Sequence, residues 1–239
     1  MGMRAATDIS SELRTLLADQ EEVRILFAAA PSQTEMLLSL TQTSGVDWSR
    51  VSAFHMDEYL GLADGAPQRF GVWLRQYIFD KLPFRAVHLI EPGDDPGRAA
   101  ADYADELNAA PIDIVCCGIG VNGHLAFNDP PADFDDPLTV KIVALDWRSR
   151  QQQVDDKCFA SIEAVPTHAV TVTIPALLSA RTIFCTVPGE QKNQAIRDML
   201  EGPVTPQCPA TALRLHPRCT LYLDPDSAGD ICFDGCRKI

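Results

Sequence analysis

The stretch of the chain that most strongly suggests chemistry is GIGVNGHLAFNDP, residues 118–130. Its glycines allow the backbone to approach a ligand closely. His124 follows them, and Asn122 and Asp129 stand close to it in the sequence. Pairing with a carboxylate fixes the tautomer of an imidazole and raises its basicity, so such a ring can move protons near neutral pH. The stretch therefore predicts a proton-transfer site in which His124 works with Asp129 or Asn122.

The same stretch begins with GIGVNG, which has the G-x-G-x-x-G form of dinucleotide-binding loops. In those loops a helix follows the glycines, and the loop comes after the first strand of its unit. Here no long helical pattern follows, and the preceding apolar run is the fourth along the chain. The glycines therefore do not indicate a dinucleotide site.

Two carboxylates, Asp57 and Glu58, follow the apolar run VSAFHM at residues 51–56. A carboxylate beside a binding site can act as a general base. An isolated Asp-Glu pair is more often part of a solvated acidic loop, and a histidine such as His55 near a strand end is more often structural. From the pair alone, both interpretations of the carboxylates stay open.

Two further segments could bind an anion. Ser32, Gln33 and Thr34 come directly after Pro31 at the start of a predicted helix, where backbone amide groups bind phosphate readily. Simple capping of that helix would need no ligand. Lys192 lies at the start of another predicted helix, where a lysine opposes the helix dipole. Its placement favours an anionic partner.

Three more cations, Arg148, Arg150 and Lys157, lie in residues 131–168, a segment rich first in proline and aspartate and then in polar residues. A long irregular insertion in a domain is often a lid or a binding loop. We expect a lid here that could carry a cation to the site. A solvated surface is the alternative, and for Arg148 it is the better interpretation.

Short apolar runs alternate with amphipathic stretches along the chain. The apolar runs predict strands at residues 23–30, 51–56, 86–90, 112–120, 169–174, 182–187 and 219–224. The amphipathic stretches predict helices at residues 34–42, 68–82, 97–109 and 190–202. This alternation is typical of α/β proteins with a mostly parallel sheet and helices on both faces. We expect one domain over residues 1–239, with the polar segments converging where the strands end.

The composition argues against several kinds of partner. The net charge is −13 and no basic patch is visible, which argues against nucleic-acid binding. No apolar run approaches the length of about 18 residues that a membrane span needs, so we expect no membrane association. The eight cysteines are expected to be reduced thiols of a cytoplasmic protein. Only Cys232 and Cys236 have a metal-like spacing, and without a second pair we expect no metal site.

Four segments together carry a family resemblance: HMDEYLGL, GIGVNGHLAFNDP, VPGEQKNQAI and LRLHPRCTLYLD. The chain resembles the glucosamine-6-phosphate deaminase (isomerase) family from about residue 22 to residue 226. That family is grouped with the 6-phosphogluconolactonases, but the AFNDP element differs from what the lactonase branch would show. The resemblance implies a modified Rossmann-like α/β fold and conversion of glucosamine 6-phosphate and water into fructose 6-phosphate and ammonia. It also implies that no metal or organic cofactor takes part, and that the protein forms a homo-oligomer.

The resemblance also implies roles for individual residues. Asp57 matches the general base that takes the C2 proton and delivers it to C1. His124 matches the histidine that assists opening of the sugar ring. Asn122 stands where the family has aspartate or asparagine, and Asp129 stands where it usually has glutamate.

The remaining matches concern the phosphate of the substrate. Ser32, Gln33 and Thr34 match the phosphate loop, which in the family is usually richer in glycine. Lys192 matches a phosphate-binding lysine. A lid arginine of the family falls near residues 150–157, where Arg150 and Lys157 are both candidates.

The non-glycine phosphate loop and the short Asp129 leave room for a different amino-sugar phosphate or for weak deaminase activity. Two other functions stay open. A lactonase-type hydrolase would use His124 as a base without needing Asp57. A sugar-phosphate sensor would keep the pocket and lose turnover.

Overall fold

The computed structural model describes residues 1–231, whose main feature is a six-stranded sheet in the order β4-β2-β1-β5-β8-β9. Its strands are β1 (Val23–Phe27), β2 (Val51–His55), β4 (Ala86–His88), β5 (Ile114–Cys117), β8 (Thr182–Val187) and β9 (Cys219–Leu223). Every pairing between them is parallel. This confirms the predicted α/β fold with a mostly parallel sheet.

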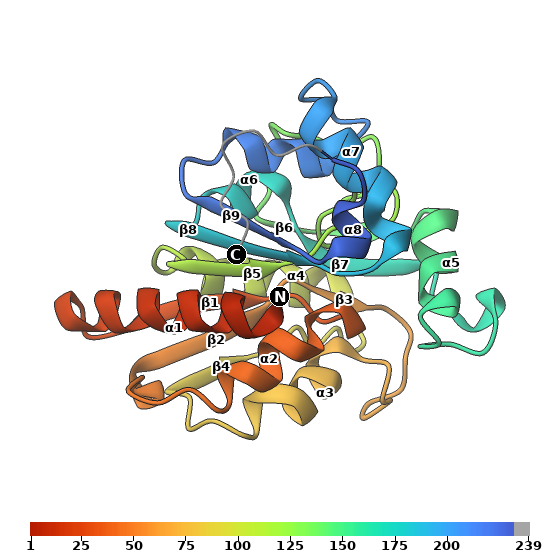
Figure 1. Ribbon diagram of the computed structural model, residues 1–239. Coiled ribbons are helices and arrows are strands. Elements are labelled where there is room, and N and C mark those ends of the chain that lie inside the picture. The colour runs from red at the N-terminus through yellow and green to blue at the C-terminus, as the bar shows by residue number, and fades with distance from the viewer. Residues whose placement is uncertain (232–239) are drawn as a thin grey trace.

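Both faces of this sheet are buried, as continuous apolar strands require. Along β1, the side chains of Ile25 and Phe27 enter one core and that of Leu26 enters the other. The first core is covered by α1 (Gly2–Asp19), which lies across the front of the sheet in Figure 1, by α2 (Thr34–Leu40), and by α3 (Phe70–Leu74) with its π-helical continuation η3 (Arg75–Phe79). The second core is covered by α4 (Pro96–Asn108), α6 (Ile174–Leu178) and α7 (Asn193–Glu201).

A second sheet of three antiparallel strands adjoins the first. It has the order β3-β7-β6 and consists of β3 (Asp57–Tyr59), β6 (Val140–Ala144) and β7 (His168–Val172). The predicted strand at 169–174 therefore exists, but it lies outside the parallel sheet because both its partners run antiparallel to it.

Met56 joins the two sheets through its backbone. Its N–H donates to the carbonyl of Phe27 in the parallel sheet at 3.1 Å, and its own carbonyl accepts from the N–H of Val172 in the second sheet at 2.8 Å. The residue after this junction is Asp57, so both sheets fix the backbone from which that carboxylate projects.

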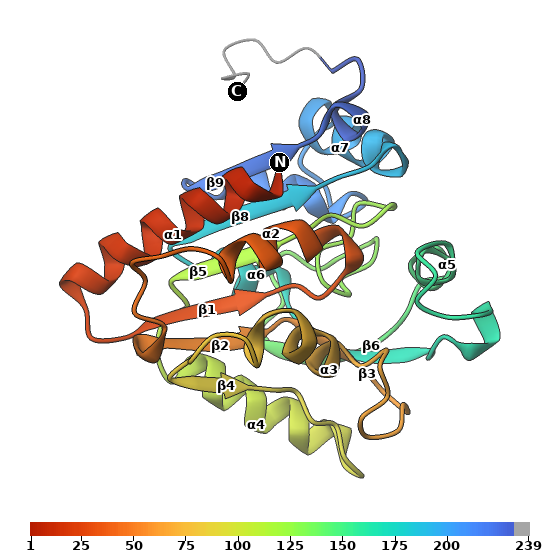
Figure 2. The ribbon, with the colours of Figure 1, turned by 60° about the horizontal axis from the view of Figure 1, so that its bottom comes forward.

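The segment 131–168 is more regular than the sequence indicated. It contains β6, the helix α5 (Trp147–Asp155) and the 3-10 turn η4 (Ile162–Ala164). The side chain of Asp146 caps α5 by accepting from the N–H of Arg148. Figure 2 shows α5 standing beyond the ends toward which the arrows of the parallel strands point. Its place is where a lid over the carboxyl ends of the strands would lie.

The other short elements are η1 (Pro31–Gln33), η2 (Trp48–Arg50), η5 (Glu190–Lys192), η6 (Pro209–Leu215) and α8 (Pro225–Ala228). Within residues 1–231 no helix combines the length and apolar character needed to cross a membrane. Six cysteines of this part of the chain are free thiols: Cys116, Cys117, Cys158, Cys185, Cys208 and Cys219. The predicted status of Cys232 and Cys236 lies outside the described residues.

Candidate active site

A small cavity of about 60 Å³ lies at the carboxyl ends of the parallel strands. Residues that follow β1, β2, β5 and β8 line it, together with two glutamines of α5. Its polar lining side chains are Ser32, Gln33, Asp57, His124, Gln152, Gln153 and Lys192. The four polar segments that were expected to converge thus do meet at one cavity. A second cavity of about 280 Å³ adjoins it and shares Ala29, Ala30, Phe70 and Gln153.

Asp57 and Glu58 are both buried, which rules out the solvated acidic loop. The carboxylate of Glu58 accepts hydrogen bonds from the backbone N–H groups of Phe70 and Gly71, each at 3.0 Å, at the start of α3. Arg69 pairs with it at 3.7 Å. Glu58 is therefore a structural acid that holds α3 in place.

Asp57 has a different environment. It lines the cavity, and its Oδ1 has no hydrogen-bond partner among the described residues. Burial, and secondarily the negative charge of Glu58, raises the pKa of the Asp57 carboxyl well above its ordinary value. A carboxylate that is buried, unpartnered and open to a cavity is suited to take up a proton.

His124 is held by three groups at its Nδ1. Asn122 Oδ1 lies 2.7 Å from that nitrogen, Ser149 Oγ lies 2.8 Å away, and Asp129 Oδ1 lies 3.3 Å away. Since these groups occupy Nδ1, the other ring nitrogen, Nε2, is the one left for a ligand. Sequence reasoning anticipated Asn122 and Asp129 here but missed Ser149.

Asp129 remains ionised because of its neighbours. Burial acts to raise the pKa of its carboxyl, but hydrogen bonds and charge from His124, followed by hydrogen bonds from Ser149 and Asn122, outweigh burial and lower it to about 2. Its second oxygen accepts from the N–H of Asp146 at 2.9 Å. The site therefore keeps a permanent negative charge beside the imidazole.

Gly120 is required by the position of the imidazole. A Cβ added at Gly120 would overlap the Cε1, Nδ1 and Nε2 atoms of His124. Gly123 has a φ of +83°, and a Cβ there would lie 2.8 Å from the sulfur of Cys208. These glycines let the loop fold back on itself so that the ring packs directly against the backbone.

Lys192 is the cation that the fold brings into this cavity. Its side chain is buried and lines the cavity from η5, after β8. Burial lowers its pKa to about 8, although the negative charge of Asp156 acts in the opposite direction. No carboxylate of residues 1–231 forms an ion pair with it, which suits a site for an anionic group.

The residues after β1 have different positions: one lines the cavity, and another holds the loop against β8. Ser32 lines the cavity and is partly exposed. Gln33 is fully buried, and its side-chain amide bonds to the carbonyl and the hydroxyl of Thr186 in β8, at 3.1 and 2.7 Å. Gln33 therefore ties this loop to β8. Thr34 begins α2 and does not line the cavity.

Neither predicted lid cation lines this cavity. The guanidinium of Arg150 donates to the carbonyls of Ile162 and Val165, at 2.6 and 2.9 Å, and so closes the turn after α5. Lys157 has a positive φ of 60° and lines the adjoining cavity. The structure therefore brings Lys157 near the site but directs Arg150 away from it.

Two glutamines of α5 line the cavity in place of a lid cation. Gln152 Oε1 accepts from the N–H of Val121 at 3.0 Å, which ties α5 to the glycine-rich loop. Gln153 lines both cavities. With Ser149, these buried residues have the i, i+3, i+4 spacing of one helix face. That spacing of small or neutral polar side chains was the signal available in the sequence.

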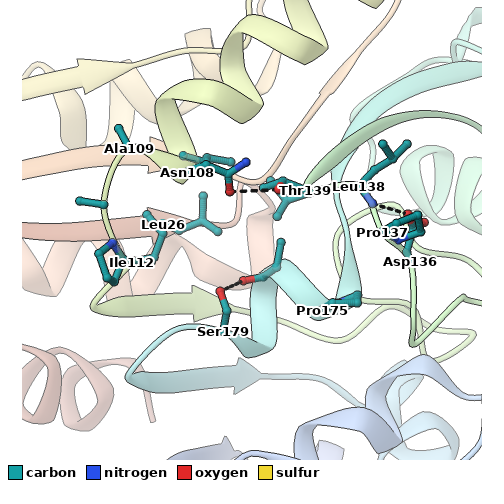
Figure 3. Close-up of a pocket in the computed structure, with 15 residues that line it drawn as sticks. Leu26, Asn108, Ala109, Ile112, Asp136, Pro137, Leu138, Thr139, Pro175 and Ser179 are labelled. Atoms are coloured by element: carbon teal, nitrogen blue, oxygen red, sulfur yellow. Dashed lines mark hydrogen bonds between the residues drawn. The ribbon is translucent and has the colours of Figure 1, made fainter.

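A larger cavity of about 600 Å³ lies elsewhere, between the end of α4, α6 and the segment leading into β6 (Figure 3). Thr139 donates to Asn108 at 3.0 Å within its lining. Asp136, the charged residue of the lining, pairs with Lys141 at 2.6 Å. None of the predicted site residues lines this cavity, so its size does not make it the candidate active site.

Comparison with known proteins shows the family of this chain. The model of the family described as glucosamine-6-phosphate isomerases/6-phosphogluconolactonase matches residues 1–221. A glucosamine-6-phosphate deaminase of Listeria monocytogenes serotype 4a is 36% identical over 208 residues, which are 87% of this chain and 87% of that protein. The chain belongs to this family.

Other relatives agree with the family assignment. A glucosamine-6-phosphate deaminase of an Exiguobacterium species is 33% identical over 206 residues, which are 85% of this chain and 79% of that protein. The solved structure of a monomeric glucosamine-6-phosphate deaminase superposes with a TM-score of 0.87 at 25% identity, covering 95% of this chain and 94% of that one. The 6-phosphogluconolactonase of Thermotoga maritima has a TM-score of 0.74 at 17% identity, covering 91% and 92% of the two chains, and shares the fold.

The contact between Gly120 and His124 leads to a first prediction. Gly120→Ala should displace the imidazole, because the added methyl group would overlap the ring. A misplacement of about 1 Å can cost on the order of 100-fold in rate, and we expect a fall of about that size in ammonia release from glucosamine 6-phosphate.

The matched control is Gly97→Ala in α4, where the nearest atom to an added Cβ is 3.5 Å away. Thermal unfolding of both variants should show a folded protein. Full activity in the Gly120 variant would contradict the assigned position of the ring.

Proposed function

We propose that the protein is a glucosamine-6-phosphate deaminase, which converts glucosamine 6-phosphate and water into fructose 6-phosphate and ammonia. The observation that carries the proposal is the buried carboxylate of Asp57, whose Oδ1 has no hydrogen-bond partner within residues 1–231, at the same cavity as His124. Conversion of an aldose to a ketose needs a base of this kind to transfer a proton between adjacent carbons. Hydrolysis of a lactone does not.

In the first step, His124 opens the sugar ring. Its Nε2 removes the proton of the C1 hydroxyl and gives a proton to the ring oxygen as the bond between that oxygen and C1 breaks. While the ring carries the extra proton, Asn122 and Ser149 hold Nδ1 and the negative charge of Asp129 stabilises the imidazolium.

In the second step, Asp57 moves a proton from C2 to C1. Opening the ring turns C1 into an aldehyde, and the hydrogen on C2 becomes acidic because it is now α to a carbonyl. Asp57 removes this proton while a proton of the substrate's ammonium group passes to the C1 oxygen, which gives a neutral enol-amine. Asp57 then delivers the C2 proton to C1. The raised pKa of Asp57 brings its basicity closer to that needed for proton transfer.

In the last step, water completes the reaction. Proton delivery to C1 leaves a C=N double bond at C2, and water adds to that carbon. The C–N bond then breaks to release ammonia, and the ketone of fructose 6-phosphate remains. No electrons are gained or lost overall, and the proposed reaction uses neither a metal nor an organic cofactor.

In this proposal the phosphate group binds to Lys192 and to the loop after β1. Lys192 supplies the positive charge, and Ser32 supplies a hydroxyl from the loop after β1. Gln33 supports this loop through its bonds to Thr186. Binding of a remote phosphate contributes free energy that positions the reacting carbons. Direct phosphate contacts by Thr34, Arg150 and Lys157 stay predictions from the family resemblance.

The experiment that tests the function is a coupled assay of purified protein with glucosamine 6-phosphate that follows ammonia and fructose 6-phosphate together. Equal amounts of the two products would support the proposal. Hydrolysis of 6-phosphogluconolactone without ammonia release would support a lactonase instead. Binding of the sugar phosphate without any turnover would support a sensor.

Asp57→Asn is the second prediction. The amide cannot accept the C2 proton, so kcat should fall by about 100-fold or more, the usual contribution of a general base. Binding of fructose 6-phosphate, measured by calorimetry, should stay nearly unchanged because the phosphate contacts remain. Asp94→Asn, an exposed carboxylate, is the control and should behave like the natural protein. Retained activity in the Asp57 variant would assign the base to another group.

Lys192 leads to a third prediction, on pH. Its charged form binds phosphate and dominates below its pKa of about 8, so kcat/KM should fall as pH rises through that value. Lys192→Ala should raise KM by about 10- to 100-fold, as expected for loss of one charged hydrogen bond, with a smaller effect on kcat. Lys192→Arg should stay charged and lose the decline above pH 8. An unchanged KM in the alanine variant would remove Lys192 from the phosphate site.

We further propose that the protein acts in the cytoplasm and forms a homo-oligomer. Large apolar side chains are exposed on several surfaces, including Trp147 at 63% and Leu215 at 61%. Light scattering of the purified protein should give the mass of two or more chains of 26.1 kDa each. A mass of a single chain would refute the oligomer and match the description of the related deaminase as monomeric.

A further inference from the structure

Ser149 lies on the inner face of α5 and is fully buried. Its hydroxyl sits between His124 and Asp129. Oγ lies 2.8 Å from His124 Nδ1 and also bonds to Asp129 Oδ1. The hydroxyl therefore contacts both members of the imidazole–carboxylate pair from an element 20 or more residues further along the chain.

The hydrogen bonds of this cluster are mutually consistent. A serine hydroxyl has one proton to donate and two lone pairs to accept with. The carboxylate of Asp129 can only accept hydrogen bonds, so the hydroxyl of Ser149 donates to it. The Nδ1–H of His124 is then shared between Asn122 Oδ1, at 2.7 Å, and one lone pair of Ser149, at 2.8 Å, while the other lone pair of Ser149 faces the side-chain N–H of Asn122 at 3.4 Å. This arrangement requires a proton on Nδ1 and leaves Nε2 free to exchange protons with a ligand.

The distance from His124 to Asp129 gives this bridge a function. Asp129 Oδ1 is 3.3 Å from Nδ1, beyond the 2.7–3.2 Å of an ordinary N–H···O hydrogen bond. Asp129 is one methylene shorter than a glutamate would be, and its other oxygen is bound by the N–H of Asp146. The carboxylate cannot move toward the ring without breaking that bond. The hydroxyl of Ser149 spans the gap from α5, alongside the Asn122 amide, whose Oδ1 lies 2.7 Å from Nδ1 and whose side-chain N–H donates to Asp129 at 3.0 Å.

We propose that Ser149 is a positioning residue that completes the link between Asp129 and His124, fixing the proton of the imidazole on Nδ1 for ring opening. This inference rests on the proposed function for its kinetic consequence. The hydrogen-bonded bridge itself is a property of the folded protein and can be tested without substrate.

The kinetic test combines Ser149→Ala with a longer carboxylate. Ser149→Ala should lower kcat by roughly 10- to 100-fold with little change in KM, because a displaced ring costs rate and the phosphate contacts remain. Asp129→Glu alone should also lower kcat, since the extra methylene competes with the hydroxyl for one space. In the double variant the glutamate can reach Nδ1 through the space that the hydroxyl has left. The double variant should therefore be more active than either single variant.

The control is Ser10→Ala on α1, which removes another buried hydroxyl that has no hydrogen-bond partner in the described part of the chain. It should keep full activity. Unchanged kcat in Ser149→Ala, or losses that simply add in the double variant, would overturn the proposal.

The test without substrate compares the NMR signals of the imidazole protons in the natural protein and in Ser149→Ala. The Nδ1 proton of His124, assigned by its loss in His124→Gln, should give a signal in the natural protein that moves or exchanges away in Ser149→Ala. If the signal changes in this way but the natural protein releases no ammonia from glucosamine 6-phosphate, the proposed function fails and the positioning role stands. If the signal is the same in both proteins, the positioning role fails whatever the activity.

Discussion

The carboxylate of Asp129 connects the glycine-rich loop after β5 to the helix that covers the cavity. On one side it binds Asn122 and lies near His124, and on the other it binds Ser149 and the N–H of Asp146 at the beginning of α5. Its charge is maintained by these donors against the effect of burial. Because one charge organises both elements, the placement of the lid and the chemistry of the imidazole depend on the same group.

The two neighbouring acids of the MDEY element show how environment assigns different roles to similar side chains. Burial raises the pKa of the Glu58 carboxyl, but backbone N–H groups and Arg69 act against that rise, and the carboxylate supports the start of α3. Asp57 faces a cavity and lacks such donors at Oδ1, so its charged form is disfavoured. Alternation of side chains along β3 separates the two environments.

The sequence predicted the parts of the fold and site that have local signals. Strands were visible as short apolar runs, and Asp57, His124 and Lys192 each follow such a run at a strand end. The N-terminal helix α1 was not predicted, although its buried residues Ala5, Ile9, Leu13 and Leu16 follow helical spacing. The parallel arrangement also allowed the convergence of these residues to be expected, since parallel strands end at one edge.

Residues of the lid could not be placed in this way. The polar composition of α5 resembles a solvated surface, and its buried face becomes evident only once the helix packs against the loop after β5. Arg150 was a candidate for phosphate because of its charge and because a lid arginine of the family falls near it, but its guanidinium donates to the carbonyls of Ile162 and Val165. Such choices depend on contacts between segments that one sequence does not reveal.

The junction at Met56 has a consequence for the choice of substrate. Backbone hydrogen bonds to both sheets hold the residue before Asp57, and Lys192 lies in η5, shortly after β8, where its N–H donates to the carbonyl of Gly189. A strand cannot shift by one residue without exchanging its two faces, so neither end of the site can slide to follow a ligand. With the roles proposed above, the fold fixes the distance between the phosphate site and the base that acts on the reacting carbons. Sugar phosphates with one carbon more or fewer would bind their phosphate and hold the wrong carbon over the base.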